Sequence, residues 1–90
     1  MKPNSQFSVP AHVIDRTVGS ETVILDLESG TYFGLDPVGA RIWQLIGTGQ
    51  SVSGICDVMV EEYQVSREVL EHDVLALTQD LVARKLIGVA

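Results

Sequence analysis

Alternating hydrophobic and polar residues near the start of the chain predict two β-strands joined by a tight turn. The alternation from Val13 to Val18 suits a strand with a solvated edge. Gly19-Ser20 fits a two-residue type II′ hairpin turn, because glycine takes the positive φ that the first turn position requires. In the following strand Val23, Leu25 and Leu27 share one face, and we expect this face to point into the core.

A third strand follows at once. Glu28-Ser29-Gly30 predicts a second tight turn, and the segment from Thr31 to Leu35 is rich in residues that favour strands, apart from Gly34. The three strands together predict an antiparallel meander.

Hydrophobic residues then recur at helical spacing in three segments. The first helix is expected to begin with Asp36 as N-cap and Pro37 as first helical residue, and to stop at Gly47. A second helix is predicted over residues 53–63, and a third after Ser66, a good N-cap. The expected core stripe of the third helix is Leu70, Val74, Leu77 and Leu81, with Arg84 and Lys85 in its last turn.

The order of these elements predicts an α+β fold, similar to a winged helix-turn-helix, in which a three-stranded antiparallel sheet is followed by three helices. A chain of 90 residues is long enough for one domain with one modest core. We expect residues 1–10 to form a flexible N-terminal arm, with room for a short strand at Phe7 to Val9, and residues 11–90 to form the single domain.

The charge of the chain bears on its partners. The formal net charge is −6 and the six basic residues are scattered, so a polyanionic partner is disfavoured. A winged-helix DNA-binding protein is the alternative from another class, although the last helix carries acidic residues and no Lys or Arg between Glu68 and Val82. No apolar run approaches the roughly 18 to 20 residues that span a bilayer, and the N-terminus lacks an apolar signal core. We therefore expect a cytoplasmic protein without a nucleic-acid or membrane partner.

The common motifs of catalysis and cofactor binding are missing from the chain. The sequence contains no H-E-x-x-H, C-x-x-C, P-loop or G-x-G-x-x-G pattern. Cys56 is the single cysteine and lies among apolar neighbours, which favours burial in the core over a nucleophilic role. His72 stands between Glu71 and Asp73, but adjacent helical residues diverge by about 100° and rarely converge on one metal ion. We expect no enzyme activity, no cofactor and no metal.

The third predicted strand is a candidate binding edge. Thr31 to Leu35 contains no charge and no proline, so an extended peptide could add to it as a further strand. The aromatic residues Tyr32 and Phe33 either flank such a peptide or simply fill the core, and the sequence does not choose. The last helix offers two possible groove walls, one with Val69, Asp73, Ala76 and Asp80, the other with Leu75 and Val82.

Residues 23–46 read V-I-L-D-L-E-S-G-T-Y-F-G-L-D-P-V-G-A-R-I-W-Q-L-I, which resembles the PqqD-like family. These proteins are the recognition elements of pathways that make ribosomal peptide natural products (RiPPs). Asp36-Pro37 replaces the usual Asn and the residue after it. The stretches V-E-E-Y-Q-V-S-R-E-V-L-E-H-D-V and L-V-A-R-K-L-I resemble the second and third helices of the family. The resemblance covers nearly the whole chain after about residue 11, so residues 11–90 are identified as one PqqD-like peptide-recognition domain.

This resemblance implies a non-catalytic adaptor that binds the leader segment of a precursor peptide as an added strand against the last helix. The adaptor would hold the precursor for a partner enzyme and raise its effective concentration there. Trp43 and Ile42 would belong to the core. The residues implied to bind the peptide are Thr31, Tyr32, Phe33, Gly34 and Leu35 on the strand, and Val69, Asp73, Ala76, Leu77 and Asp80 on the helix.

Two kinds of pathway remain open. One kind of family member serves a leader peptidase and a cyclase in lasso-peptide biosynthesis, and the other serves a radical enzyme in pyrroloquinoline quinone synthesis. The wording Y-F-G-L-D-P-V-G-A-R-I-W is closer to the lasso-peptide kind, which we favour. A structural subunit that pairs sheet edges with its own copies is a third hypothesis, and we expect a monomer or weak dimer.

Overall fold

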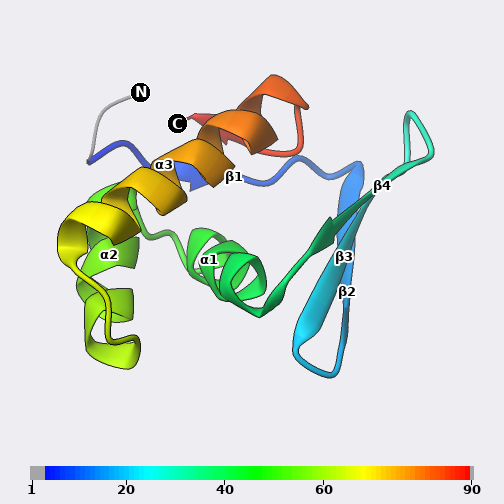
Figure 1. Cartoon of the computed structure of the whole chain (residues 1–90). Helices are drawn as coiled ribbons and strands as arrows, with labels where there is room; N and C mark the ends of the chain where they lie inside the picture. The colour runs from blue at the N-terminus through cyan, green and yellow to red at the C-terminus, as the bar shows by residue number, and fades with distance from the viewer. Residues whose placement is uncertain (1–3, 90) are drawn as a thin grey trace.

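The structure is a computed structural model that describes residues 4 to 89. Its main sheet has the strand order β2-β3-β4 with antiparallel neighbours, and the three long helices all lie on one side of it (Figure 1). The predicted α+β fold, a three-stranded antiparallel sheet followed by three helices, is confirmed. The elements are β2 (Val13–Val18), β3 (Glu21–Asp26), β4 (Thr31–Leu35), α1 (Pro37–Gly47), α2 (Val52–Glu62) and α3 (Arg67–Ala83).

A second, smaller sheet joins the two ends of the described chain. β1 (Phe7–Ser8) pairs antiparallel with β5 (Gly88–Val89), and the Phe7 side chain is buried in the core. The short strand that the sequence allowed at Phe7 to Val9 is thus present. Residues 1–3 of the predicted arm lie outside the described residues, and the division at residue 10 stays a prediction.

The turn between β2 and β3 sets the register of the sheet. Gly19 has φ = 63° and the φ of Ser20 is not positive. A type II′ turn requires this combination at its two central residues. The turn therefore has the predicted type, and it places Val18 opposite Glu21.

The face of β3 that packs on the helices is the opposite of the predicted one. Thr22 and Ile24 are almost fully buried, at 1% and 0% exposure, whereas Val23 is 38% and Leu27 is 56% exposed. The expectation that Val23, Leu25 and Leu27 face the core is wrong. Because both faces of this strand carry large apolar side chains, its alternation does not identify the buried one. Thr22 satisfies its hydroxyl within the sheet, with Thr17 Oγ1 at 3.2 Å.

The predicted starts of α1 and α3 are confirmed by their caps, whereas α2 begins at Val52, one residue before the predicted position. The Asp36 carboxylate accepts a hydrogen bond from the Gly39 N–H at 2.8 Å, and the Ser66 hydroxyl accepts one from the Val69 N–H at 3.2 Å. Pro37 is the first residue of α1, where no intrahelical partner for its missing N–H is needed. Among residues 4 to 89, no helix has both the length and the hydropathy needed to cross a bilayer.

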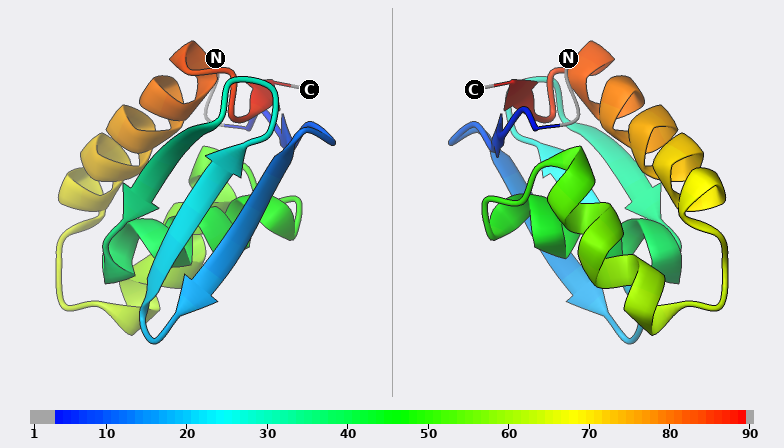
Figure 2. Two further views of the ribbon diagram at one scale, coloured as in Figure 1. Left: turned by 90° about the vertical axis from the view of Figure 1, so that its right-hand side faces the viewer. Right: turned by 90° about the vertical axis from the view of Figure 1, so that its left-hand side faces the viewer.

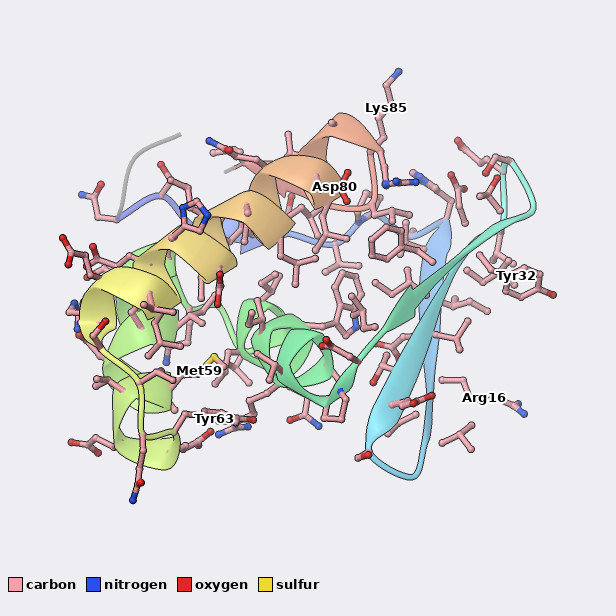
Figure 3. All side chains as sticks on the ribbon, viewed as in Figure 1. Arg16, Tyr32, Met59, Tyr63, Asp80 and Lys85 are labelled. Carbon is pink, nitrogen blue, oxygen red and sulfur yellow. The ribbon has the colours of Figure 1, made fainter. Side chains whose placement is uncertain are left out.

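The core lies between the three helices and the inner face of the sheet. Met59 of α2 points into it (Figure 3), and Cys56 beside it is fully buried, as predicted. Burial raises the pKa of the Cys56 thiol, which disfavours a reactive thiolate. On α3 the expected core residue Leu77 is only partly buried. Thr78 is fully buried instead, because its hydroxyl donates to the Val74 carbonyl at 2.9 Å.

The end of α3 differs from the prediction. The helix ends at Ala83, so Arg84 and Lys85 lie beyond its last turn. The Leu86 N–H donates to the Leu81 carbonyl at 2.9 Å and the Lys85 N–H to the Val82 carbonyl at 3.0 Å, the pattern of a Schellman motif. Lys85 takes the left-handed position of this motif, with φ = 61°.

We expect Lys85→Gly to raise the free energy of unfolding by about 0.5 to 1 kcal/mol, because glycine avoids the cost that a side chain adds in the left-handed region. Urea denaturation measures this change. Ala83→Gly, inside the helix, should instead lower the free energy of unfolding by up to about 1 kcal/mol. If both substitutions lower the free energy of unfolding equally, the left-handed conformation of Lys85 does not cost the protein stability.

Candidate functional site

The free edge of β4 lies beside α3. Figure 2 shows α3 next to β4 at one side of the sheet, and within the described part of the chain no helix lies over the sheet face that points away from the core. Among the described residues, β4 pairs only with β3, so its other edge is open. An unpaired edge offers main-chain donors and acceptors to a further strand.

The register shows which residues of β4 offer these groups. A two-residue hairpin closes on a hydrogen-bonded pair, here Val18 and Glu21, and residues along an antiparallel strand then point their N–H and C=O groups alternately to either side. The main-chain groups of Glu21 bond to β2. Those of Thr22, and of every second residue after it, therefore bond to β4. The β4 residues opposite those positions, including Phe33 opposite Ile24, therefore use their main-chain groups on β3.

Tyr32 and Gly34 are the residues of β4 left with main-chain groups on the free edge. Each supplies one N–H and one C=O, so the five-residue strand can form up to about four hydrogen bonds with an added strand. Side chains of the added strand that lie opposite Phe33 would point inward, between β4 and α3.

The inward side of this edge has a cavity at each end. A cavity of about 430 Å³ lies where the end of β4 meets α1 and α3. Its wall is largely apolar, with Phe33, Leu35 and Ile42, and α3 contributes Asp73 and Leu77. None of the ion pairs between residues 4 and 89 involves Asp73, so its carboxylate has no cationic partner there.

The second cavity, of about 270 Å³, lies at the start of β4. Thr31, Tyr32 and Phe33 line it together with Arg84 and Leu86, from the segment after α3. Phe33 thus lines both cavities and separates them along the strand.

Arg84 ties the end of α3 to β4. Its guanidinium carbon lies 4.7 Å from the centroid of the Phe33 ring, a cation–π contact. Its Nε donates to Asp80 at 3.0 Å. Desolvation raises the pKa of Asp26 in the same cavity, but hydrogen bonds from the Glu28 N–H and from Ser29 outweigh this effect and lower it overall. The inward side of the β4 edge, between β4 and α3, is the groove. Its end near Thr31 therefore presents both signs of charge.

The two aromatic residues have different positions. Tyr32 is 70% exposed and points away from the helices (Figure 3), while Phe33 is partly buried against the core. The choice that the sequence left open therefore has a separate answer for each ring. Phe33 forms part of the inner wall, and Tyr32 belongs to the outer face of the sheet.

The structure also shows which flank of α3 faces β4. Asp73 and Leu77 line a cavity with β4, so the flank of Asp73 is the inner one, and Leu75 lies on the other side of the helix. Asp80 is on the inner flank and pairs with Arg84. The other two predicted helix residues, Val69 and Ala76, are exposed and line neither of these cavities.

Sequence reasoning missed Arg84 and Leu86 as groove residues. Arg84 follows Leu77 by seven positions, which is about two helical turns and places both on the same flank. This spacing was the available signal. Leu86 had none, because it reaches the groove only through the turn that follows α3.

The other edge of the sheet, at β2, is protected against strand addition. Beside β2 lies a cavity of about 740 Å³, lined by Val9, Val13, Asp15, Trp43 and other residues. Asp15 points inward from this edge strand, and its carboxylate accepts a hydrogen bond from the Trp43 indole. An inward-pointing charge on an edge strand discourages strand addition. The β4 edge, which carries no charge, is therefore the favoured one despite the larger cavity at β2.

Among the described residues, no group of three or more His, Cys, Asp or Glu side chains is arranged to hold a metal ion. The fold and the groove define a class of small α+β domain that can accept an extended segment as an additional strand at an open sheet edge.

The family model described as coenzyme PQQ synthesis protein D (PqqD) matches residues 21–87, and the chain belongs to this family. The structure is similar to that of TbiB1 in complex with the TbiA(beta) leader peptide, with 36% sequence identity and a TM-score of 0.85 over 90% of this chain and 94% of that chain. It is also similar to lasso peptide synthetase B1 complexed with the leader peptide, with 26% identity and a TM-score of 0.85 over 92% and 98% of the two chains. The comparison with curated proteins gives no match.

Proposed function

We propose that this protein is a non-catalytic adaptor that binds the leader segment of a ribosomally made precursor peptide as a fourth strand on β4. The observation that carries the proposal is the pair of free main-chain positions, Tyr32 and Gly34, on an uncharged edge beside α3. The two solved structures with leader peptides bound support it, because each covers at least 90% of this chain with the same fold.

The groove indicates how the leader would be read. Main-chain bonds to β4 give affinity for any extended segment, and inward side chains give specificity. The inward side chain opposite Phe33 would lie beside its ring, and those two positions away on either side would enter the cavities. Because the walls combine apolar side chains with the free carboxylate of Asp73, we expect apolar anchors and a Lys or Arg near the Leu35 end.

The adaptor would act by bringing two partners together. It would hold the precursor for a leader peptidase, and for the cyclase that follows it, in lasso-peptide biosynthesis, and so raise the local concentration of substrate. Its place would be the cytoplasm, where precursors are made. We expect it to be a monomer or weak dimer in solution and to need no cofactor.

Calorimetry with a synthetic leader from the precursor encoded nearby tests the proposal. We expect a dissociation constant of about micromolar or tighter, as for an interface that joins strand pairing to two side-chain pockets. Absence of binding by every leader encoded near this protein would refute it.

The α3 side of the groove gives a second prediction. Leu77→Ala should weaken leader binding by about 5- to 30-fold, because it removes an apolar wall worth about 1 to 2 kcal/mol. Leu75→Ala makes the same change on the opposite flank and should leave the dissociation constant unaltered. Circular dichroism should show that both variants are folded at the temperature of the titration. Equal losses would place the peptide elsewhere.

The description of the matched family favours a second candidate, a peptide chaperone for a radical enzyme in pyrroloquinoline quinone synthesis. The same groove would serve, with a different precursor. Titration with the precursor of pyrroloquinoline quinone beside a lasso-peptide leader separates the two, since the cognate peptide should bind more tightly.

A further inference from the structure

The outer face of the sheet is unusually apolar for a surface turned to solvent. An antiparallel sheet with one solvated face normally places polar residues on that face. Here Ile14 is 47%, Val23 38% and Tyr32 70% exposed, and all three point away from the helices. Exposed apolar residues that lie side by side, unlike scattered ones, mark interaction sites.

The register makes these residues continuous. Ile14 of β2 lies opposite Leu25 of β3, and Leu25 lies opposite Tyr32 of β4, so the three form one row across the sheet. The neighbouring row runs from Arg16 through Val23 to Gly34. Figure 2 shows that none of the helices between residues 4 and 89 covers this face.

A peptide added to β4 would extend the same rows. Side chains directly opposite each other on paired strands point to the same face. The leader residue opposite Tyr32 would therefore stand on the outer face, next in line after Ile14, Leu25 and Tyr32. A partner seated on this face would touch the adaptor and the leader together.

The charges favour one kind of occupant. Arg16 is a cation on this face and points outward (Figure 3), while Glu21 and Glu28 are exposed at its ends. With a net charge of −6 per chain, two copies repel each other, whereas a partner with basic residues around an apolar surface is attracted.

We propose that the row Ile14, Leu25 and Tyr32, continued by the bound leader, is the docking surface for the enzyme that processes the precursor. The enzyme is expected to present an apolar patch with Lys and Arg at its rim. This inference rests on the proposed function, because the leader supplies the last part of the surface. Such a surface explains how the enzyme can bind an adaptor that carries a precursor more tightly than an empty adaptor.

The test uses the full-length protein, its synthetic leader and the leader peptidase of the same pathway. Ile14→Lys should weaken binding of the peptidase to the adaptor–leader complex at least tenfold in biolayer interferometry. Because Ile14 is two strands from β4, about 10 Å away, its substitution should leave leader affinity unchanged in calorimetry, which also reports a folded groove. Val65→Lys makes the same change at another exposed apolar residue, outside the sheet, and should alter neither affinity.

The outcomes separate this inference from the proposed function. If the wild-type protein binds no leader, the proposed function fails. If it binds leader but the peptidase does not bind the complex, or binds the Ile14→Lys complex equally well, the docking surface is refuted while the adaptor remains. If sedimentation shows a wild-type dimer that Ile14→Lys dissociates, the face is an interface between copies, and the inference is also refuted.

Discussion

Gly34→Pro is expected to weaken leader binding by about 10- to 100-fold while leaving the protein folded. The substitution removes the Gly34 N–H from the free edge and leaves a carbonyl of the bound peptide without a donor, at a cost of about 1 to 3 kcal/mol. A proline is tolerated at this place, because the lost N–H does not pair with β3. A Cβ at this position meets no atom within 4 Å.

Gly34→Ala is the matched control, since it adds a side chain but keeps the N–H. Its leader affinity, measured by calorimetry in the same buffer, should stay within about threefold of wild type, a difference below 1 kcal/mol. If Gly34→Ala and Gly34→Pro bind equally well, the edge is not used for strand addition. Phe33→Pro is a poorer probe, because the Phe33 N–H faces β3 and its loss damages the sheet itself.

Ile24→Ala is expected to lower the free energy of unfolding by about 3 kcal/mol, which is a large part of the stability of so small a domain. Ile24 is fully buried in the central strand, so the truncation leaves a cavity among the helices and the sheet. Urea denaturation followed by circular dichroism measures the change.

Leu27→Ala provides the comparison, because Leu27 is 56% exposed and directly follows the last residue of the same strand. We expect its free energy of unfolding to remain within about 0.5 kcal/mol of wild type. Should Leu27→Ala cost as much as Ile24→Ala, the inner and outer faces of β3 would have been assigned the wrong way round.

Local chemistry made much of the fold predictable. The glycine at the first position of a two-residue turn, the N-caps Asp36 and Ser66 and the proline after Asp36 each act within a few residues, so the sequence specifies them directly. The order of strands and helices follows from these boundaries. The uncharged β4 edge could also be read from residues 31–35, because what protects an edge, charge or proline, is a property of the residues themselves.

Positions that depend on packing between distant elements were not predictable in the same way. Ile24 and Thr22 face the helices although the opposite face of β3 carries Val23 and Leu25, because the choice depends on which rows complete the core. Thr78 is fully buried where Leu77 was expected, and its burial is tolerated because the Val74 carbonyl of the same helix accepts its hydroxyl.

The candidate site shows the same division between what the sequence determines and what the tertiary structure decides. Residue types along 31–35 were enough to indicate a strand that can be extended, and the resemblance to the family followed from residues 23–46 and the later helical stretches. Only the tertiary structure decided that Asp73 and Leu77 stand at the inner wall, that Arg84 covers Phe33, and that Tyr32 points to the opposite face. The angle at which a helix packs on a sheet is set by the whole core, so the sequence of a single strand or helix does not determine it.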